Sequence, residues 1–174
     1  MIRKTVLTVV FSMLVVACAA CAPKKVVEHD ITASCVENSQ YSISLIPVIA
    51  GKSFRSEPNA FHIVLMNKTN KDIELVWDET VYITRGGTRG LFMQEGDRFA
   101  DASGHKPNDI IFSGTALDKT IWPCALTEFS RSWWNNPMPI GENGAVVTLI
   151  VDGEKKRERL MARTYIVDYS AKSN

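Results

Sequence analysis

The sequence predicts an all-β fold, an antiparallel β-sandwich of about eight strands. From Tyr41 onward, apolar residues recur with a period of two, which is the signal of half-buried strands. Turn-forming residues separate these runs, and no long amphipathic helix pattern competes with them. The expected strands are 41–50, 59–67, 72–84, 89–94, 109–113, 119–123, 145–151 and 157–169.

The first two runs show the strand pattern most directly. Apolar and polar side chains alternate in residues 41–46 (YSISLI) until Pro47, as in a strand with one buried face. Residues 61–66 (FHIVLM) are largely apolar on both faces, which predicts a central strand covered on two sides. Residues 67–72 (NKTNKD) then collect turn formers.

In the third run, residues 72–84, the apolar residues stay on one face of the expected strand although polar residues interrupt the run. Trp77 lies on the face that Val81 continues. A regular strand would turn Glu79 inward, so we expect a bulge or a bend there. Residues 85–87 (RGG) then end the strand, and residues 91–93 (LFM) begin the next one.

The last two runs predict a hairpin. Residues 145–151 (AVVTLIV) are β-branched and apolar, and the pair Asp152-Gly153 suits a tight turn with positive φ. Residues 155–162 contain good helix formers, but residues 164–167 (TYIV) prefer strands. Because the turn favours pairing back, we expect a strand with a charged, exposed start.

The N-terminus predicts export. Arg3 and Lys4 precede an apolar stretch of 12 residues from Val6 to Ala17. That stretch is shorter than the roughly 20 residues that a membrane-spanning helix needs. We therefore interpret residues 1–17 as a signal peptide.

The end of this stretch resembles the lipobox of bacterial lipoproteins. Residues 14–18 (LVVAC) place a small residue before Cys18, and the resemblance implies that Cys18 receives a diacylglycerol and becomes the mature N-terminus. With Ala19 as the second mature residue, similarity to Gram-negative lipoproteins implies the periplasmic face of the outer membrane. Such an anchor holds because each buried methylene contributes about 0.8 kcal/mol.

Two alternatives to Cys18 stay open. Lipidation at Cys21 would leave Cys35 and Cys124 as one pair, but Cys18 then stands where a lipobox has a branched aliphatic residue. An ordinary cleaved signal peptide followed by a chance cysteine is the other alternative.

Residues 18–40 are predicted to be a lipid-anchored tether, and residues 41–174 to be the β-sandwich domain. Cys35, late in the tether, is expected to form a disulfide with Cys124, because an exported chain meets an oxidising compartment. A disulfide that closes so long a loop stabilises by roughly 3–4 kcal/mol.

Residues 67–77 (NKTNKDIELVW) resemble small immunoglobulin-like modules of bacterial lipoproteins, in which a polar turn leads into a strand bearing a core Trp. The resemblance implies an immunoglobulin-like sandwich and carries no active residues. A domain of roughly 135 residues buries about two thirds of its unfolded-chain surface, so it needs no metal to fold. We expect no cofactor.

Composition and charge exclude two classes of function. The 174 residues are 45% hydrophobic, which is too apolar for a disordered chain. Removal of Arg3 and Lys4 with the signal peptide takes the formal net charge from +1 to −1, so nucleic-acid binding is not expected. The basic run 155–159 (KKRER), which contains Glu158, is interpreted as a guard of charges on an edge strand.

No motif predicts catalysis, and we expect the protein not to be an enzyme. His29, His62 and His105 are scattered, without the spacing of metal ligands. Serines in the loops lack a nucleophile-elbow motif. The adjacent carboxylates Asp78 and Glu79 are expected to face opposite ways, in a solvated bend.

Residues 129–139 (FSRSWWNNPMP) contain the best candidate for a contact surface. Trp133 and Trp134 beside Pro in a loop form an aromatic surface for a partner protein or a glycan. The alternative is that one Trp plugs the end of the sandwich while the other lies along the surface.

Together these observations predict a non-catalytic, lipid-anchored cell-envelope protein. Its sandwich domain is expected to contact another envelope component, within a larger assembly. The alternative is a carbohydrate- or small-ligand-binding periplasmic module, and a hydrolase assembled from distant loops is the third hypothesis.

Overall fold

The computed structural model describes residues 26–29, 34–50, 57–98, 104–130 and 132–167. The chain divides into two units, Val27–Tyr165 and a second made of Met1–Val26 with Ile166–Asn174. The sandwich belongs to the first unit. The predicted signal peptide and the candidate lipidation residues Cys18 and Cys21 lie outside the described residues.

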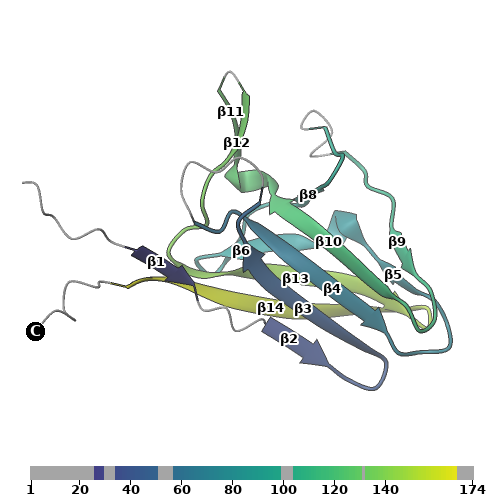
Figure 1. Cartoon of the computed structure of the whole chain (residues 1–174). Coiled ribbons are helices and arrows are strands. Elements are labelled where there is room, and N and C mark those ends of the chain that lie inside the picture. Colours follow the sequence, from purple (N-terminus) through teal and green to yellow (C-terminus); the bar gives the residue numbers. More distant parts are fainter. Residues whose placement is uncertain (1–25, 30–33, 51–56, 99–103, 131, 168–174) are drawn as a thin grey trace, which may run out of the picture. The chain divides into compact units, whose positions relative to one another are not determined.

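The fold is all-β and antiparallel, as predicted, with two sheets and a ribbon (Figure 1). The seven-stranded sheet has the order β1-β14-β13-β5-β9, and β6 pairs with β13 and with β7. The five-stranded sheet has the order β2-β3-β4-β10-β8, and β11 pairs with β12 alone. The strands are β1 (Val26–His29), β2 (Ser34–Glu37), β3 (Tyr41–Val48), β4 (Ala60–Asn67), β5 (Ile73–Leu75), β6 (Val81–Thr84), β7 (Gly87–Thr88), β8 (Phe92–Gln94), β9 (Asp109–Ile111), β10 (Ala116–Pro123), β11 (Thr127–Ser130), β12 (Ser132–Asn135), β13 (Gly141–Val151) and β14 (Glu154–Val167).

Each of the eight expected ranges contains a strand, but the run 72–84 is divided. A 3₁₀ turn, Trp77–Glu79, separates β5 from β6, so the bend expected at Glu79 is present. This turn lets β5 and β6 pair with successive parts of the long strand β13.

The structure also has strands that the sequence pattern did not predict. The strand β2 lies in the range expected to be tether, so the sandwich begins before the predicted boundary at residue 40. Val36 lies opposite Ile43 of β3 and packs against the core. A strand of four residues turns only two side chains inward, which is too few to show as a period in the sequence.

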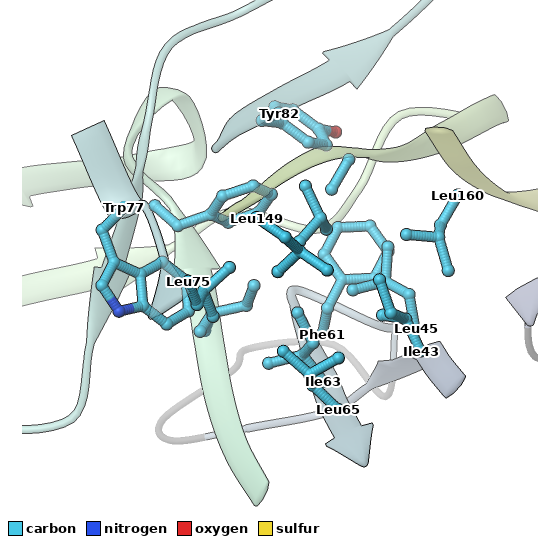
Figure 2. Packing of buried hydrophobic residues seen from close by; sticks show 14 of the residues in the cluster. Ile43, Leu45, Phe61, Ile63, Leu65, Leu75, Trp77, Tyr82, Leu149 and Leu160 are labelled. Atoms are coloured by element: carbon cyan, nitrogen blue, oxygen red, sulfur yellow. The ribbon is translucent and has the colours of Figure 1, made fainter. Parts of the chain in front are cut away.

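The core lies between the two sheets. Along β3, buried Tyr41, Ile43 and Leu45 alternate with half-buried neighbours. Figure 2 shows the inward side chains of both sheets in one cluster. The labelled members are Ile43, Leu45, Phe61, Ile63, Leu65, Leu75, Trp77, Tyr82, Leu149 and Leu160. Full burial of one such side chain is worth about 1.5–3 kcal/mol.

Strand β4 is central in its sheet, but only one of its faces is fully covered. Phe61, Ile63 and Leu65 are buried, whereas His62 is half-buried and Met66 is 45% exposed. The expectation of cover on two sides is therefore wrong. The outward-facing side chains of β4, His62, Val64 and Met66, are half-buried or exposed in the described structure.

The tight turn at Asp152-Gly153 matches its residues. Asp152 has φ 54° and Gly153 has φ 79°, and they join Val151 to Glu154 as a two-residue hairpin. Positive φ at both central residues defines a type I′ turn, so the predicted hairpin is confirmed. Residues 154–167 form a strand and not a helix because this turn aligns them with β13.

The predicted disulfide between Cys35 and Cys124 is not formed. Cys35 lies opposite Ser44, which lies opposite Val64, which in turn lies opposite Asp118 of β10. Three strand spacings span about 14 Å, and the six residues from there to Cys124 span about 20 Å. The Cα atoms of a disulfide lie at most about 7 Å apart, so the order of the strands keeps these two thiols separate.

No helix in the described part of the chain is long and apolar enough to cross a membrane.

Candidate functional site

The site with the most distinctive geometry is the edge of the five-stranded sheet where β8 ends before β10 does. Strand β8 pairs with β10 only opposite Ile121, Trp122 and Pro123. After Gln94 the chain turns away: Asp97 N–H donates to the Gln94 carbonyl at 3.1 Å, and Gly96 takes φ 90°. Residues 116–120 of β10 therefore continue past the end of β8, as Figure 1 shows.

The direction of the backbone groups along β10 follows from two hydrogen bonds. Asn67 N–H donates to the Thr115 carbonyl at 2.9 Å, so the odd-numbered residues face β4. Cys124 N–H donates to the Leu91 carbonyl at 3.0 Å, so the even-numbered residues face β8. In an antiparallel ladder these directions alternate strictly.

It follows that the backbone groups of Asp118 and Thr120 point to the side that β8 has left. Within the described residues no strand pairs with the Asp118 backbone groups or with the Thr120 N–H, whereas the Thr120 carbonyl faces Glu95 beside the Ile121–Gln94 pair. An open groove of about 480 Å³ lies at this place. Its lining residues are Gln94, Glu95, Asp118, Lys119 and Thr120.

Lys119 forms the inner wall of the groove, and its position is firmly held. Its Nζ donates to Asp109 Oδ2 at 2.5 Å and to Gln94 Oε1 at 3.0 Å. The same ammonium group lies 5.8 Å from the ring centre of Trp77, within the range of a cation–π interaction. Trp77 Nε1 in turn donates to Asp109 Oδ2 at 2.8 Å.

A second ion pair connects β8 to the turn that follows it. Lys106 is buried, and its Nζ donates to the Phe92 carbonyl at 2.6 Å and to Asp97. Partial burial raises the pKa of Asp97, but the hydrogen bonds from Lys106 and from Gln94 N–H outweigh it and lower the pKa. The Asp97 carboxyl is therefore charged near neutral pH.

Asp78 holds the segment that carries Lys106. Its Oδ1 accepts Lys106 N–H at 2.8 Å, and its Oδ2 contacts His105 Nδ1. The backbone hydrogen bond from Lys106 is the main reason why the pKa of Asp78 is lowered. Asp78 and its neighbour Glu79 do point to different partners, as expected for adjacent residues.

The outer rim of the groove is acidic. The Asp118 side chain is 65% exposed and lies 3.0 Å from His62 Nε2. Glu95 is exposed and has no ion pair among the described residues. Since Lys119 is engaged by Asp109, the groove presents backbone hydrogen-bonding groups and two carboxylates to an incoming ligand.

Trp133 and Trp134 were expected in a loop, but they lie on a β-ribbon. Trp133 lies opposite Phe129, and Trp134 lies opposite Glu128. Figure 1 shows the β11–β12 ribbon projecting away from the strands of both sheets. Trp134 is half-buried. The pair is therefore carried by a regular hairpin that extends from the end of the sandwich.

The basic run on β14 is divided between the two faces of its sheet. Lys155 and Arg157 point outward to Glu79, at 2.5 Å and 3.2 Å, and the hydrogen bond from Lys155 is the main reason why the pKa of Glu79 is lowered. Glu158 points the other way and accepts a hydrogen bond from Tyr41 Oη at 2.6 Å. Glu158 therefore does not neutralise the outward-facing basic side chains.

The remaining predicted residues are not brought together. Cys35 is exposed on β2, and Cys124 is half-buried directly after β10, where burial raises the pKa of its thiol. Among the residues that the structure describes, no group of three His, Cys, Asp or Glu side chains is arranged to hold a metal ion.

Sequence reasoning missed the groove. The pattern predicted strands of similar length at 89–94 and 119–123, whereas β8 has 3 residues and β10 has 8. The strand pairing that leaves Asp118 and Thr120 at an open edge is not encoded in local pattern. The chain matches no protein-family model and no curated protein.

Proposed function

We propose that this protein is a non-catalytic, lipid-anchored component of the bacterial cell envelope. Its anchor is the diacylglycerol on Cys18, and its location is the periplasmic face of the outer membrane. The β-sandwich contacts another envelope component through the β11–β12 ribbon that bears Trp133 and Trp134.

One observation carries this proposal: residues 14–18 (LVVAC) end an export-type apolar stretch ahead of a β-sandwich that has its own core. The buried Trp77 after the polar turn 67–72 supports the immunoglobulin-like resemblance. The projecting ribbon supports a contact role, because the backbone that carries Trp133 and Trp134 extends away from the strands of both sheets (Figure 1).

Mass spectrometry of the mature N-terminus tests the anchor. We expect a diacylglycerol-modified and N-acylated Cys18, and we expect that Cys18→Ser abolishes the lipid. Cys21→Ser is the matched control and should keep it. A mature chain that starts elsewhere and lacks lipid would contradict the proposed location.

Copurification tests the contact surface. We expect that replacing both Trp133 and Trp134 by Ala removes a specific partner from the membrane-extracted lipoprotein, with an unchanged far-UV circular dichroism spectrum. Phe112→Ala, at an exposed apolar residue away from the ribbon, serves as the control. An unchanged partner set would contradict the role of the ribbon, and Trp-dependent binding of cell-wall glycan would support the ligand-binding alternative.

A further inference from the structure

We propose that the open edge of β10 is a strand-addition site, which receives an extended segment of another polypeptide carrying a Lys or Arg side chain. This site is additional to the envelope contact proposed above. It requires neither the lipid anchor nor the ribbon.

The first support is the backbone of β10. The N–H and C=O groups of Asp118 and the N–H of Thr120 point to the side where β8 is missing, and no strand within the described residues pairs with them. An edge with unpaired N–H and C=O groups is the template that β-strand addition uses. An added segment would continue the line of β8.

The second support is space. The groove of about 480 Å³ follows this edge, and its lining includes Gln94 and Glu95, where β8 gives way to the turn. Three residues of an extended chain span about 10 Å. The groove therefore offers volume for a short extended segment beside β10.

The third support is a rigid wall. Lys119 is held by Asp109 and Gln94 and lies over Trp77. A pre-formed site spends little of its binding free energy on ordering itself. The edge is therefore already in the conformation that an added strand requires.

Charge decides which kind of segment fits. The exposed carboxylates at the rim are Glu95 and Asp118, while the Lys119 ammonium is engaged by Asp109. A basic side chain beside Asp118 complements this rim. A second copy of this chain would bring the same two carboxylates to the shared edge, so charge favours a different polypeptide.

A pair of substitutions at one residue tests the site. Proline removes an N–H and is tolerated where that N–H faces away from the ladder, as Thr120 N–H does. Thr120→Pro therefore removes one open-edge donor and keeps the β4 pairing. Thr120→Ala keeps the donor and removes only the side chain, so it is the matched control.

The probe is a phage-displayed library of random ten-residue peptides, selected on the purified full-length protein. We expect enriched peptides to alternate in the manner of a strand and to contain Lys or Arg. Their affinity should fall about ten-fold in Thr120→Pro, as expected for loss of a backbone hydrogen bond at a desolvated edge. It should stay within about two-fold in Thr120→Ala.

Further measurements keep the outcome decisive. Thr120→Pro should unfold within a few degrees of the wild type, whereas Lys119→Pro, which removes a donor from the β4 ladder, should unfold at a clearly lower temperature. If Thr120→Pro itself fails to fold, N-methylated versions of the selected peptide replace it. One version is methylated at its odd-numbered amides and the other at its even-numbered amides, and only the version that blocks the amides facing β10 should lose binding. Asp118→Asn should weaken basic peptides selectively.

Three results would overturn the proposal. They are the absence of any enriched peptide, equal affinity for the Thr120→Pro and Thr120→Ala variants, and a self-association that Thr120→Pro abolishes, which would make a second copy the occupant. Trp134→Ala should leave peptide binding unchanged, so failure of the ribbon contact and failure of this site are distinguishable.

Discussion

At the scale of single residues, two positions in the β13 region show how closely the interior is packed. Gly144 lies opposite Met161, and a Cβ atom there would lie 2.0 Å from the Leu160 carbonyl oxygen. Tyr82 and Asn143 form a buried hydrogen bond, in which Tyr82 Oη donates to Asn143 Oδ1 at 2.7 Å. Each of these contacts predicts the effect of one substitution.

Gly144→Ala should lower the free energy of unfolding by about 2–3 kcal/mol, because the clashing atom belongs to the backbone and must move with its strand. Urea unfolding followed by Trp fluorescence measures this. Gly87→Ala is the control, since a Cβ atom at Gly87 would have no other atom within 4 Å, and it should change the free energy by at most about 0.5 kcal/mol. Equal effects of both substitutions would contradict the clash.

Alkaline pH should destabilise the fold through Tyr82. Burial raises the pKa of Tyr82 to about 12. Because the folded-state pKa lies above the ordinary value of about 10, the stabilisation is complete below pH 10 and is lost as the pH rises toward 12. We expect urea midpoints to fall between pH 10 and 12 in the wild type.

Tyr82→Phe should flatten this alkaline decline. At neutral pH it should cost about 1–2 kcal/mol, because Asn143 Oδ1 loses its donor. Urea unfolding at pH 8 and at pH 11 separates the two effects. An alkaline decline of the same steepness in both proteins would show that another group is responsible.

At the scale of elements, strand order decides which residues meet. The order β2-β3-β4-β10-β8 puts Cys35 at one edge of its sheet and the β10 end, with Cys124, beside the other edge strand. The same order leaves Asp118 and Thr120 without a neighbouring strand. The strand order thus separates the thiols, and the shortness of β8 opens the groove.

Cys35→Ser should leave the unfolding temperature within about 1 °C of the wild type under oxidising conditions, because no covalent link is lost. Differential scanning calorimetry with and without reductant measures this. A native disulfide would instead contribute about 2–4 kcal/mol and give a clear reductant-dependent decrease. Cys124→Ser is less suitable as the test, since that side chain is half-buried.

At the scale of the whole sandwich, the two sheets are joined by the apolar core in the centre and by an ion pair or a hydrogen bond near each edge. At one edge, Lys119 of β10 bonds Asp109 of β9. At the other, Tyr41 of β3 bonds Glu158 of β14. These bonds link specific residues of the two sheets, whereas apolar burial is non-directional.

Asp97→Asn should destabilise the protein by about 3 kcal/mol, because it leaves the Lys106 ammonium buried without its countercharge. The Lys106 side chain is 6% exposed, and that of Asp97 is 28% exposed. Urea unfolding at pH 7 measures the loss. Asp118→Asn, at an exposed carboxylate, is the control and should have little effect.

Acid should act through the same ion pair. Since the folded-state pKa of Asp97 is lowered, its stabilisation is present above the ordinary Asp pKa of about 4 and is lost as the pH falls through the folded-state value. We expect unfolding midpoints to decline below about pH 4 in the wild type and to decline less in Asp97→Asn. An identical decline in both would exclude Asp97 as a source.

Local pattern was sufficient to predict the fold class and most of the strands. The alternation in β3, the Asp152-Gly153 turn and the bend at Glu79 are all visible in the sequence because each depends on residues within a few positions of one another. The lipobox-like run at Cys18 is equally local, and it remains a prediction.

What only the tertiary structure decided depends on residues far apart in the chain. It includes the separation of Cys35 from Cys124, the inward turn of Glu158 toward Tyr41, and the open edge at Asp118 and Thr120. A period of two along the sequence predicts whether a side chain faces the core or the solvent, but it does not predict which strand lies beside it. Neighbouring strands are set by packing and loop closure over the whole domain, and the candidate binding site is a product of that choice.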